Sequence, residues 1–259
     1  MSAEPTRAPL PGTRPAGTSD EAEASRRVQE MFGRIAPRYD FLNHLLSLSL
    51  DRVWRRRTAR RFAHILRRPD ARTLDLCCGT GDLTMELERE GVSGCPRQPG
   101  MILGSDFAPA MLTRAREKAK GRSPAPEYLA ADALALPFAD ASFDLVTAAF
   151  GFRNLANYER GLNEIRRVLR PQGEVGILEF SEPEGMFRPL YRFYFEKILP
   201  RVGGAISGNA EAYAYLPGSV EKFPRPEELR GWMEKAGLCG TRSELWSFGI
   251  VALHTARRA

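Results

Sequence analysis

The run LDLCCGTGDLT at residues 74–84 constrains the fold more than any other part of the sequence. A short apolar stretch, Thr73 to Leu76, leads into Gly79 and Gly81, and an amphipathic stretch follows at about 82–91. Glycine lets the backbone turn tightly and approach a ligand, and the N-terminus of a helix offers free N–H groups to an anion. The run therefore predicts a strand, a glycine turn and a helix, with a ligand at the turn.

The same alternation continues along the chain. Amphipathic stretches at about 109–120 and 157–170 separate apolar runs at 102–105, 127–130, 143–149 and 175–180. Strands that alternate with helices at this spacing indicate βαβ units and a mainly parallel sheet. A helix at 227–236 and two β-like runs at about 240–247 and 249–255 predict a C-terminal hairpin with an antiparallel strand. We expect an α/β fold with a doubly wound, mainly parallel seven-stranded sheet.

The flanking segments define the domain organisation. Residues 1–25 are rich in Pro, Ala, Gly and Thr and lack the apolar segment of a secretory signal, so we expect a disordered tail. Residues 26–259 should form one domain, with N-terminal helices over 26–70, broken at Pro37, and an aromatic-rich insertion over 183–224 that forms a lid. No stretch approaches the roughly 20 apolar residues that span a bilayer. Four cysteines without a CxxC pair and three histidines favour reduced thiols and no metal site.

Three acidic residues follow or end predicted strands. Asp106 ends the second strand, where a carboxylate can accept hydrogen bonds from both ribose hydroxyls. Asp132 follows the third strand and can bind the adenine amino group, and Asp75 can hold an ammonium directly or through water. These are the polar groups of S-adenosylmethionine. A dinucleotide would also need its pyrophosphate held, and Cys77 stands where dinucleotide fingerprints have their first glycine. We therefore predict that this methyl donor binds at the glycine turn.

From residue 28 to the end the chain resembles the menaquinone/ubiquinone C-methyltransferases, which methylate a ring carbon of a polyprenylated quinol precursor. Two stretches carry the resemblance: YDFLNHLLSLSLDRVW at 39–54 and RVLRPQGEVGILEFS at 167–181. Shorter matches are FGFRN at 150–154, LPR at 199–201, AYAYL at 212–216 and GIVALH at 249–254. The sequence departs from the family at Cys77 and at Asp51, where many relatives have histidine.

The resemblance implies a class I methyltransferase fold and a set of donor contacts. These contacts fall on Thr80, Asp106, Asp132 and Ala133. A family serine corresponds here to Ala149, so its side-chain hydrogen bond is absent. The implied reaction converts demethylmenaquinol to menaquinol, with a benzoquinol of the ubiquinone pathway as the alternative acceptor.

Carbon methylation needs an electron-rich ring, a sink for phenolate character and a route for the proton. Arg153 follows the fourth strand at the edge of the sheet where such folds bind ligands, and its permanent charge suits phenolate stabilisation. A structural ion pair is the competing interpretation. Asn154, Tyr39 and Asp40 are further candidates, Tyr39 and Asp40 by closing over the donor. Five aromatic residues of the insertion are candidates to cover the site or to pack in the core: Phe187, Tyr191, Phe193, Tyr194 and Phe195.

Eight arginines and no acid lie between Arg52 and Arg68. Such localised charge indicates an anionic partner, and a quinol acceptor favours the inner face of the cell membrane, with the protein otherwise cytoplasmic. No nucleic-acid-binding module is recognisable. An RNA, DNA or protein methyltransferase is the competing enzyme, although AAFGFRN at 148–154 is not an NPPY-type turn. A donor-binding protein without turnover also fits, and the sequence is compatible with a homodimer.

Overall fold

The computed structural model describes residues 12, 13, 15, 17, 18, 20–94, 100–183, 185, 188–194 and 218–259. Its centre is a seven-stranded sheet in the order β3-β2-β1-β4-β5-β7-β6. The strands are β1 Arg72–Leu76, β2 Met101–Asp106, β3 Glu127–Ala130, β4 Phe143–Ala149, β5 Leu169–Phe180, β6 Leu238–Trp246 and β7 Val251–Arg258. Strands β1 to β5 run parallel, and β7 is antiparallel to both β5 and β6. The predicted fold class and the C-terminal hairpin are confirmed.

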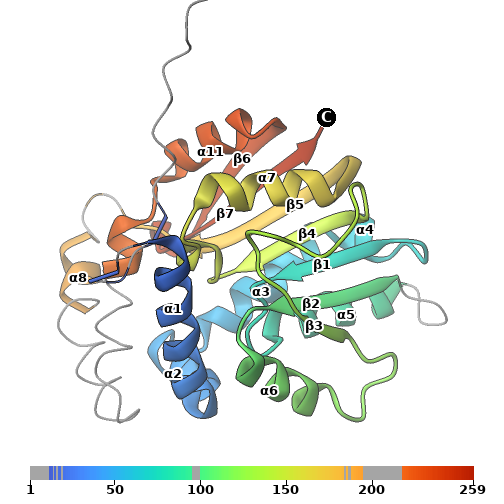
Figure 1. Ribbon diagram of the computed structural model, residues 1–259, viewed down its shortest axis with the longest axis horizontal. Coiled ribbons are helices and arrows are strands. Elements are labelled where there is room, and N and C mark those ends of the chain that lie inside the picture. Colours follow the sequence, from blue (N-terminus) through green and yellow to red (C-terminus); the bar gives the residue numbers. More distant parts are fainter. Residues whose placement is uncertain are drawn as a thin grey trace, which may run out of the picture.

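Helices cover both faces of the sheet (Figure 1). On one face lie α3 Leu50–Arg61, α4 Ala63–Leu66 and α5 Asp82–Gly94, whose apolar side chains form a core with Ile102 and Leu145. On the other lie α7 Tyr158–Val168 and α11 Pro226–Lys235, packed against Leu74, Val146 and Val175. Helix α6 Pro109–Ala119 packs on β2 and β3. Near-continuous burial of β4 explains why its sequence is apolar throughout.

The N-terminal segment is more ordered than the sequence predicted. Helix α1 spans Glu21–Ile35, so residues 21–25 of the expected disordered tail are helical. The side chain of Asp20 caps this helix by accepting a hydrogen bond of 2.8 Å from the backbone N–H of Glu23. Thr13 is also buried, and its backbone N–H donates to the Leu155 carbonyl at 2.8 Å. The tail prediction is therefore wrong for these described residues.

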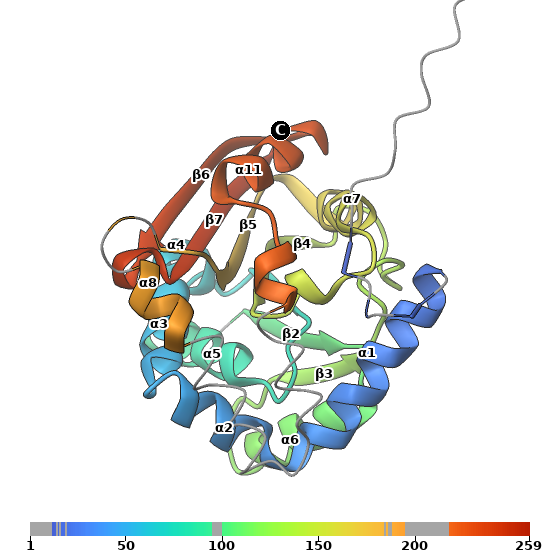
Figure 2. The ribbon, with the colours of Figure 1, turned by 90° about the vertical axis from the view of Figure 1, so that its left-hand side faces the viewer.

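The helices α1, α2 Tyr39–Leu46 and α8 Arg188–Phe193 lie at the same end of the sheet (Figure 1), and Figure 2 shows them spread around that end. The short helix η1 Ala36–Arg38 joins α1 to α2. Strands β1 to β5 point toward this end. The break at Pro37 is confirmed, because Pro37 lies inside η1. Other boundaries shift slightly: β5 begins at Leu169, although 169–170 were expected to be helical.

Much of the aromatic-rich insertion predicted over 183–224 falls outside the described residues, including Phe187 and Phe195. The matches at 199–201 and 212–216 are outside as well. Tyr191 and Tyr194 are described and pack with Phe32, Tyr39 and Phe107 on a cluster between α1 and α6, whereas Phe193 is exposed. A lid over the site stays a prediction.

Candidate active site

The glycine turn joins β1 to α5 at the end of the sheet where α1 and α2 lie. Gly79 and Gly81 have φ of 56° and 83°, which is the conformation that glycine adopts at least cost. Cys77 also has positive φ, 53°, although it carries a side chain. A Cβ added at Gly151 would lie 2.4 Å from the Cβ of Cys77. The glycine after β4 therefore makes room for the unusual cysteine of the turn.

Asp106 ends β2 beside the turn and is almost fully buried. One carboxylate oxygen accepts a hydrogen bond from the Gly79 backbone N–H at 2.9 Å, and the other accepts from the Ala108 N–H at 2.8 Å. Burial raises the pKa of Asp106 to about 6, although both backbone hydrogen bonds favour the carboxylate. These hydrogen bonds fix the carboxylate at the wall of a cavity and leave further lone pairs for a ligand.

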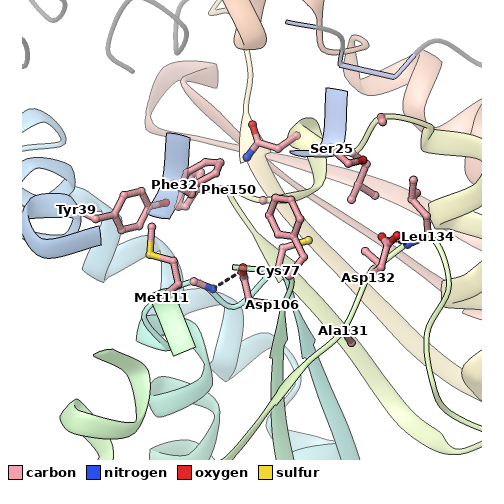
Figure 3. A pocket seen from close by; sticks show the side chains of 17 residues that line it. Ser25, Phe32, Tyr39, Cys77, Asp106, Met111, Ala131, Asp132, Leu134 and Phe150 are labelled. Atoms are coloured by element: carbon pink, nitrogen blue, oxygen red, sulfur yellow. Dashed lines mark hydrogen bonds between the residues drawn. The ribbon is translucent and has the colours of Figure 1, made fainter. Parts of the chain in front are cut away.

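The cavity beside Asp106 has an empty volume of about 640 Å³, which includes space open to solvent. Figure 3 shows Asp106 at its base, Phe32 and Tyr39 on one side, and Asp132 and Leu134 on the other. Asp132 is exposed and accepts a hydrogen bond of 2.9 Å from the Leu134 backbone N–H. The remaining walls are mainly apolar and include Phe107, Met111, Ala131, Ala133, Phe150 and Leu155. An apolar cavity with carboxylates at separate points suits a flat heterocycle joined to a sugar.

Asp75 is fully buried inside β1. Its two oxygens accept hydrogen bonds from the hydroxyls of Thr84, at 2.6 Å, and Thr147, at 2.9 Å. Burial raises the pKa of Asp75 to about 7, because these two hydroxyls offset only part of the desolvation. Asp75 lines a second, smaller cavity of about 320 Å³. The other residues that line it are Tyr39, Arg55, Cys77, Cys78, Gly79, Thr80, Asp82, Leu83 and Ala149.

A polar network ties α2 to the glycine turn. The Thr80 hydroxyl donates a hydrogen bond to Asp40, and the Lys118 ammonium of α6 donates to the other oxygen of Asp40 at 2.8 Å. Lys118 also forms an ion pair with Asp82 and a 3.1 Å hydrogen bond to the Thr80 hydroxyl. Asp40 therefore holds the N-terminal segment against the turn. The Thr80 hydroxyl already donates its proton to Asp40.

Arg153 follows β4, as predicted, and is paired with an acid. It lies in the short helix η2 Phe152–Asn154 and is buried. Its Nη1 donates to Glu179 at 2.8 Å and to the Phe150 carbonyl at 2.5 Å, and its backbone N–H donates to Glu179 at 3.0 Å. The cavity wall beside it consists of Gly151 and Asn154. The ion pair given as the competing interpretation is therefore present, and a role of Arg153 in stabilising a phenolate stays a prediction.

Tyr39 and Asn154 do line the larger cavity, as expected for groups near a substrate. Burial raises the pKa of Tyr39 above its ordinary value, although the charge of Arg153 and a hydrogen bond with Asn43 oppose this shift. The phenol is therefore neutral at ordinary pH and is a hydrogen-bond donor rather than a base. Ala149 lines the smaller cavity with a methyl group only.

Sequence reasoning missed two cations, Arg55 and Lys118, that lie within the site. Nothing in the sequence indicates that Lys118 lies in the site, because it is one of several charged residues in a predicted helix. His44, Asp51 and Asp82 bring three metal-ligating atoms together. Arg55 is already paired with Asp51, and Lys118 with Asp82, so these carboxylates have protein cations as partners.

Comparison with known proteins places the chain in a family. Residues 20–258 match the model of the ubiE/COQ5 methyltransferase family. A demethylmenaquinone methyltransferase of Thermus thermophilus is 50% identical over 88% of this chain and 100% of its own length. A protein of that name from Deinococcus radiodurans is 48% identical over 90% of this chain and 93% of its own length.

Solved structures support the fold alone, because their sequence identity is low. A SAM-dependent methyltransferase of Thermotoga maritima, described as a possible histamine N-methyltransferase, has a TM-score of 0.58 at 17% identity. It covers 89% of this chain and 99% of its own. The trans-methyltransferase CalH, in complex with SAH, has a TM-score of 0.57 at 22% identity over 82% of this chain and 60% of its own. With this Rossmann-like methyltransferase fold and a match over nearly its whole length, the chain belongs to the ubiE/COQ5 methyltransferase family.

Proposed function

We propose that this protein is an S-adenosylmethionine-dependent C-methyltransferase that converts demethylmenaquinol to menaquinol. The placement of Asp75, Asp106 and Asp132 around the glycine turn carries the methyl-donor part of the proposal. Asp106 would accept from the ribose hydroxyls, and Asp132 with the Ala133 backbone would hold the adenine edge. The acceptor rests on the names of the relatives that are 50% and 48% identical.

The donor, when bound, supplies an electrophilic methyl group on a sulfonium. The chain's own residues orient the acceptor. Tyr39 and Asn154 line the cavity and can hydrogen-bond a quinol hydroxyl, the neutral phenol of Tyr39 as donor and the amide of Asn154 as donor or acceptor. Arg153 acts from behind this wall, because its charge reaches the Tyr39 oxygen while its guanidinium stays bonded to Glu179. The quinol proton leaves to water in this scheme.

Transfer of a labelled methyl group tests the proposal. The purified protein is incubated with labelled S-adenosylmethionine and, separately, demethylmenaquinol, the demethylated benzoquinol and RNA. We expect label in menaquinol, abolished by Asp106→Ala and retained in Asp140→Asn, a change at an exposed residue outside the site. Label in the benzoquinol alone would move the protein to the ubiquinone pathway. Label in RNA alone, or donor binding without transfer to any acceptor, would refute the proposed reaction.

We also propose that the protein binds an anionic membrane surface at the inner face of the cell membrane through the start of α3. No described helix has both the length and the hydropathy needed to cross a bilayer. Leu48, Val53 and Phe248 are nevertheless 79%, 57% and 74% exposed. A hydrogen bond of 2.9 Å between Trp54 Nε1 and Ser247 Oγ brings α3 beside the residue that precedes Phe248. Exposed Arg52 on α3 adds positive charge next to these apolar groups.

Vesicle co-sedimentation tests this surface. We expect more binding to vesicles with anionic lipid than to neutral ones, and weaker binding for Arg52→Gln combined with Arg56→Gln. Each basic residue near such a surface contributes about 1 kcal/mol, so the double change should lower partitioning roughly 30-fold. Phe248→Ser should weaken binding to both vesicle types, whereas Leu129→Ser on edge strand β3 should not. Equal binding of wild type to neutral and anionic vesicles would rule the surface out.

A further inference from the structure

Arg55 stands apart from the other arginines of the basic run. Of the eight arginines between Arg52 and Arg68, all of which the structure describes, Arg55 alone is buried, with 6% of its surface exposed. It lies in the middle of α3 on the same side as Trp54, Thr58 and Ala59. Its side chain therefore points into the protein, toward the glycine turn, rather than toward solvent.

The guanidinium of Arg55 lines the smaller cavity together with Asp75, Gly79 and Thr80. Its Nη1 donates to Asp51, and its carbon lies 5.2 Å from the ring centre of Phe150, which lines the larger cavity. Among the described residues, Nη1 is the only nitrogen of this side chain with a protein hydrogen-bond partner. Arg55 thus occupies the region where the two cavities approach each other.

The charge of Arg55 is held in place by neighbouring acids. Burial lowers its pKa, but the carboxylates of Asp82 and Asp51 more than offset this, so the guanidinium stays ionised. Asp51 is shared with the Ser47 hydroxyl at 2.7 Å and with His44 at 2.8 Å. A planar guanidinium with unused N–H groups at a cavity wall is suited to a carboxylate, which it can bind with two parallel hydrogen bonds.

We propose that Arg55 binds the carboxylate of the amino-acid portion of the methyl donor, opposite the ammonium site at Asp75. This inference rests on the proposed function, because it specifies how the same donor is held. The glycine turn brings the two sites together: Gly79 lines both cavities, so a donor whose ribose lies at Asp106 can extend its amino-acid end past Gly79 toward Arg55. Arg55 is then a donor-binding residue with one defined partner.

Calorimetry with three ligands isolates that contact. S-adenosylhomocysteine has both the ammonium and the carboxylate, its decarboxylated analogue keeps the amine alone, and 5′-methylthioadenosine has neither. We expect Arg55→Met to lower the affinity for S-adenosylhomocysteine about 10- to 100-fold, as for loss of a charge-assisted hydrogen bond. The affinities for the other two ligands should change less than about twofold. Arg160→Met, at an exposed residue of α7, should change none of them.

The outcomes separate the inference from the proposed function. If Arg55→Met lowered the affinity for all three ligands equally, or for none of them, the proposed role of Arg55 would be overturned. Should Arg55→Met fail to fold, Arg55→Lys keeps a positive charge near Asp51, and its loss of affinity must again be confined to S-adenosylhomocysteine. A wild-type protein that binds none of the three ligands would instead refute the methyl-donor site itself.

Discussion

Asp75→Asn is expected to stabilise the ligand-free protein by about 2 kcal/mol at pH 5.5 and by about 4 kcal/mol at pH 8. The carboxyl of Asp75 is fully buried and accepts hydrogen bonds from the neutral hydroxyls of Thr84 and Thr147. Burial raises its pKa from 3.8 to about 7, so the folded protein favours the neutral form. Asparagine is neutral at every pH, and its amide can still hydrogen-bond both threonines.

The magnitude follows from the raised pKa. A group whose folded pKa exceeds its unfolded value contributes stability at low pH that is lost as pH rises through the folded pKa. At pH 5.5 the folded carboxyl is mostly protonated and the unfolded one mostly ionised, so wild type should be about 2 kcal/mol more stable than at pH 8 through Asp75 alone. The variant lacks this dependence. It should exceed wild type by about 2 kcal/mol at pH 5.5 and by about 4 kcal/mol at pH 8, the latter equal to roughly 8–16 °C in melting temperature.

Urea unfolding at the two pH values measures this difference. Comparing variant with wild type at each pH cancels the titration of other groups, including Asp106, whose pKa is about 6. A variant that is less stable than wild type at pH 8, or that shows the same pH dependence, would refute the assignment of a buried, partly neutral carboxyl.

The same carboxyl should make donor binding depend on pH. An ammonium at Asp75 favours the ionised form, so wild-type affinity for S-adenosylhomocysteine should rise up to about 30-fold from pH 5.5 to 8, and Asp75→Asn should weaken binding and flatten the rise. Gly81→Ala should lower the affinity for S-adenosylhomocysteine at least about tenfold in calorimetry. The reason is that φ of Gly81 is 83° and the new Cβ would lie 2.5 Å from the Tyr128 hydroxyl. Gly33→Ala in α1, where a Cβ meets no atom within 4 Å, should keep affinity and slightly raise stability. Glu179→Leu leaves the Arg153 guanidinium buried without its carboxylate and should lower the free energy of unfolding by about 3–5 kcal/mol in urea titration. An unchanged midpoint would contradict the buried pair.

Local sequence patterns predicted the central strands well because β1 and β4 are buried on both faces. Strand β4, for example, is buried over all but its last residue and reads as a continuous apolar run. The start of α1 carried an equally local signal, Asp20 followed three residues later by Glu23, which is a helix-capping pattern. The Pro-, Ala- and Gly-rich composition of residues 1–25 does not reveal this helix start, so the predicted tail wrongly includes the helical residues 21–25. The packing of Thr13 against Leu155 has no local signal, because its partner lies far along the chain.

The two arginines show why a charge in a sequence does not reveal its partner. Arg55 belongs to a run that suggests a solvated or lipid-facing helix, yet Asp51 lies one turn before it, and apolar Trp54 and Ala59 share its face. Helical periodicity therefore marks Arg55 as the inward member of the run, although only the fold shows that a cavity is there. Arg153 follows β4, and Glu179 lies near the end of β5. Since β4 and β5 are adjacent and parallel, residues at their carboxyl ends lie close together. A buried acid there forms an ion pair with the nearest cation. Strand order, which the sequence alone did not supply, thus decides which arginine is structural and which is left to bind a ligand.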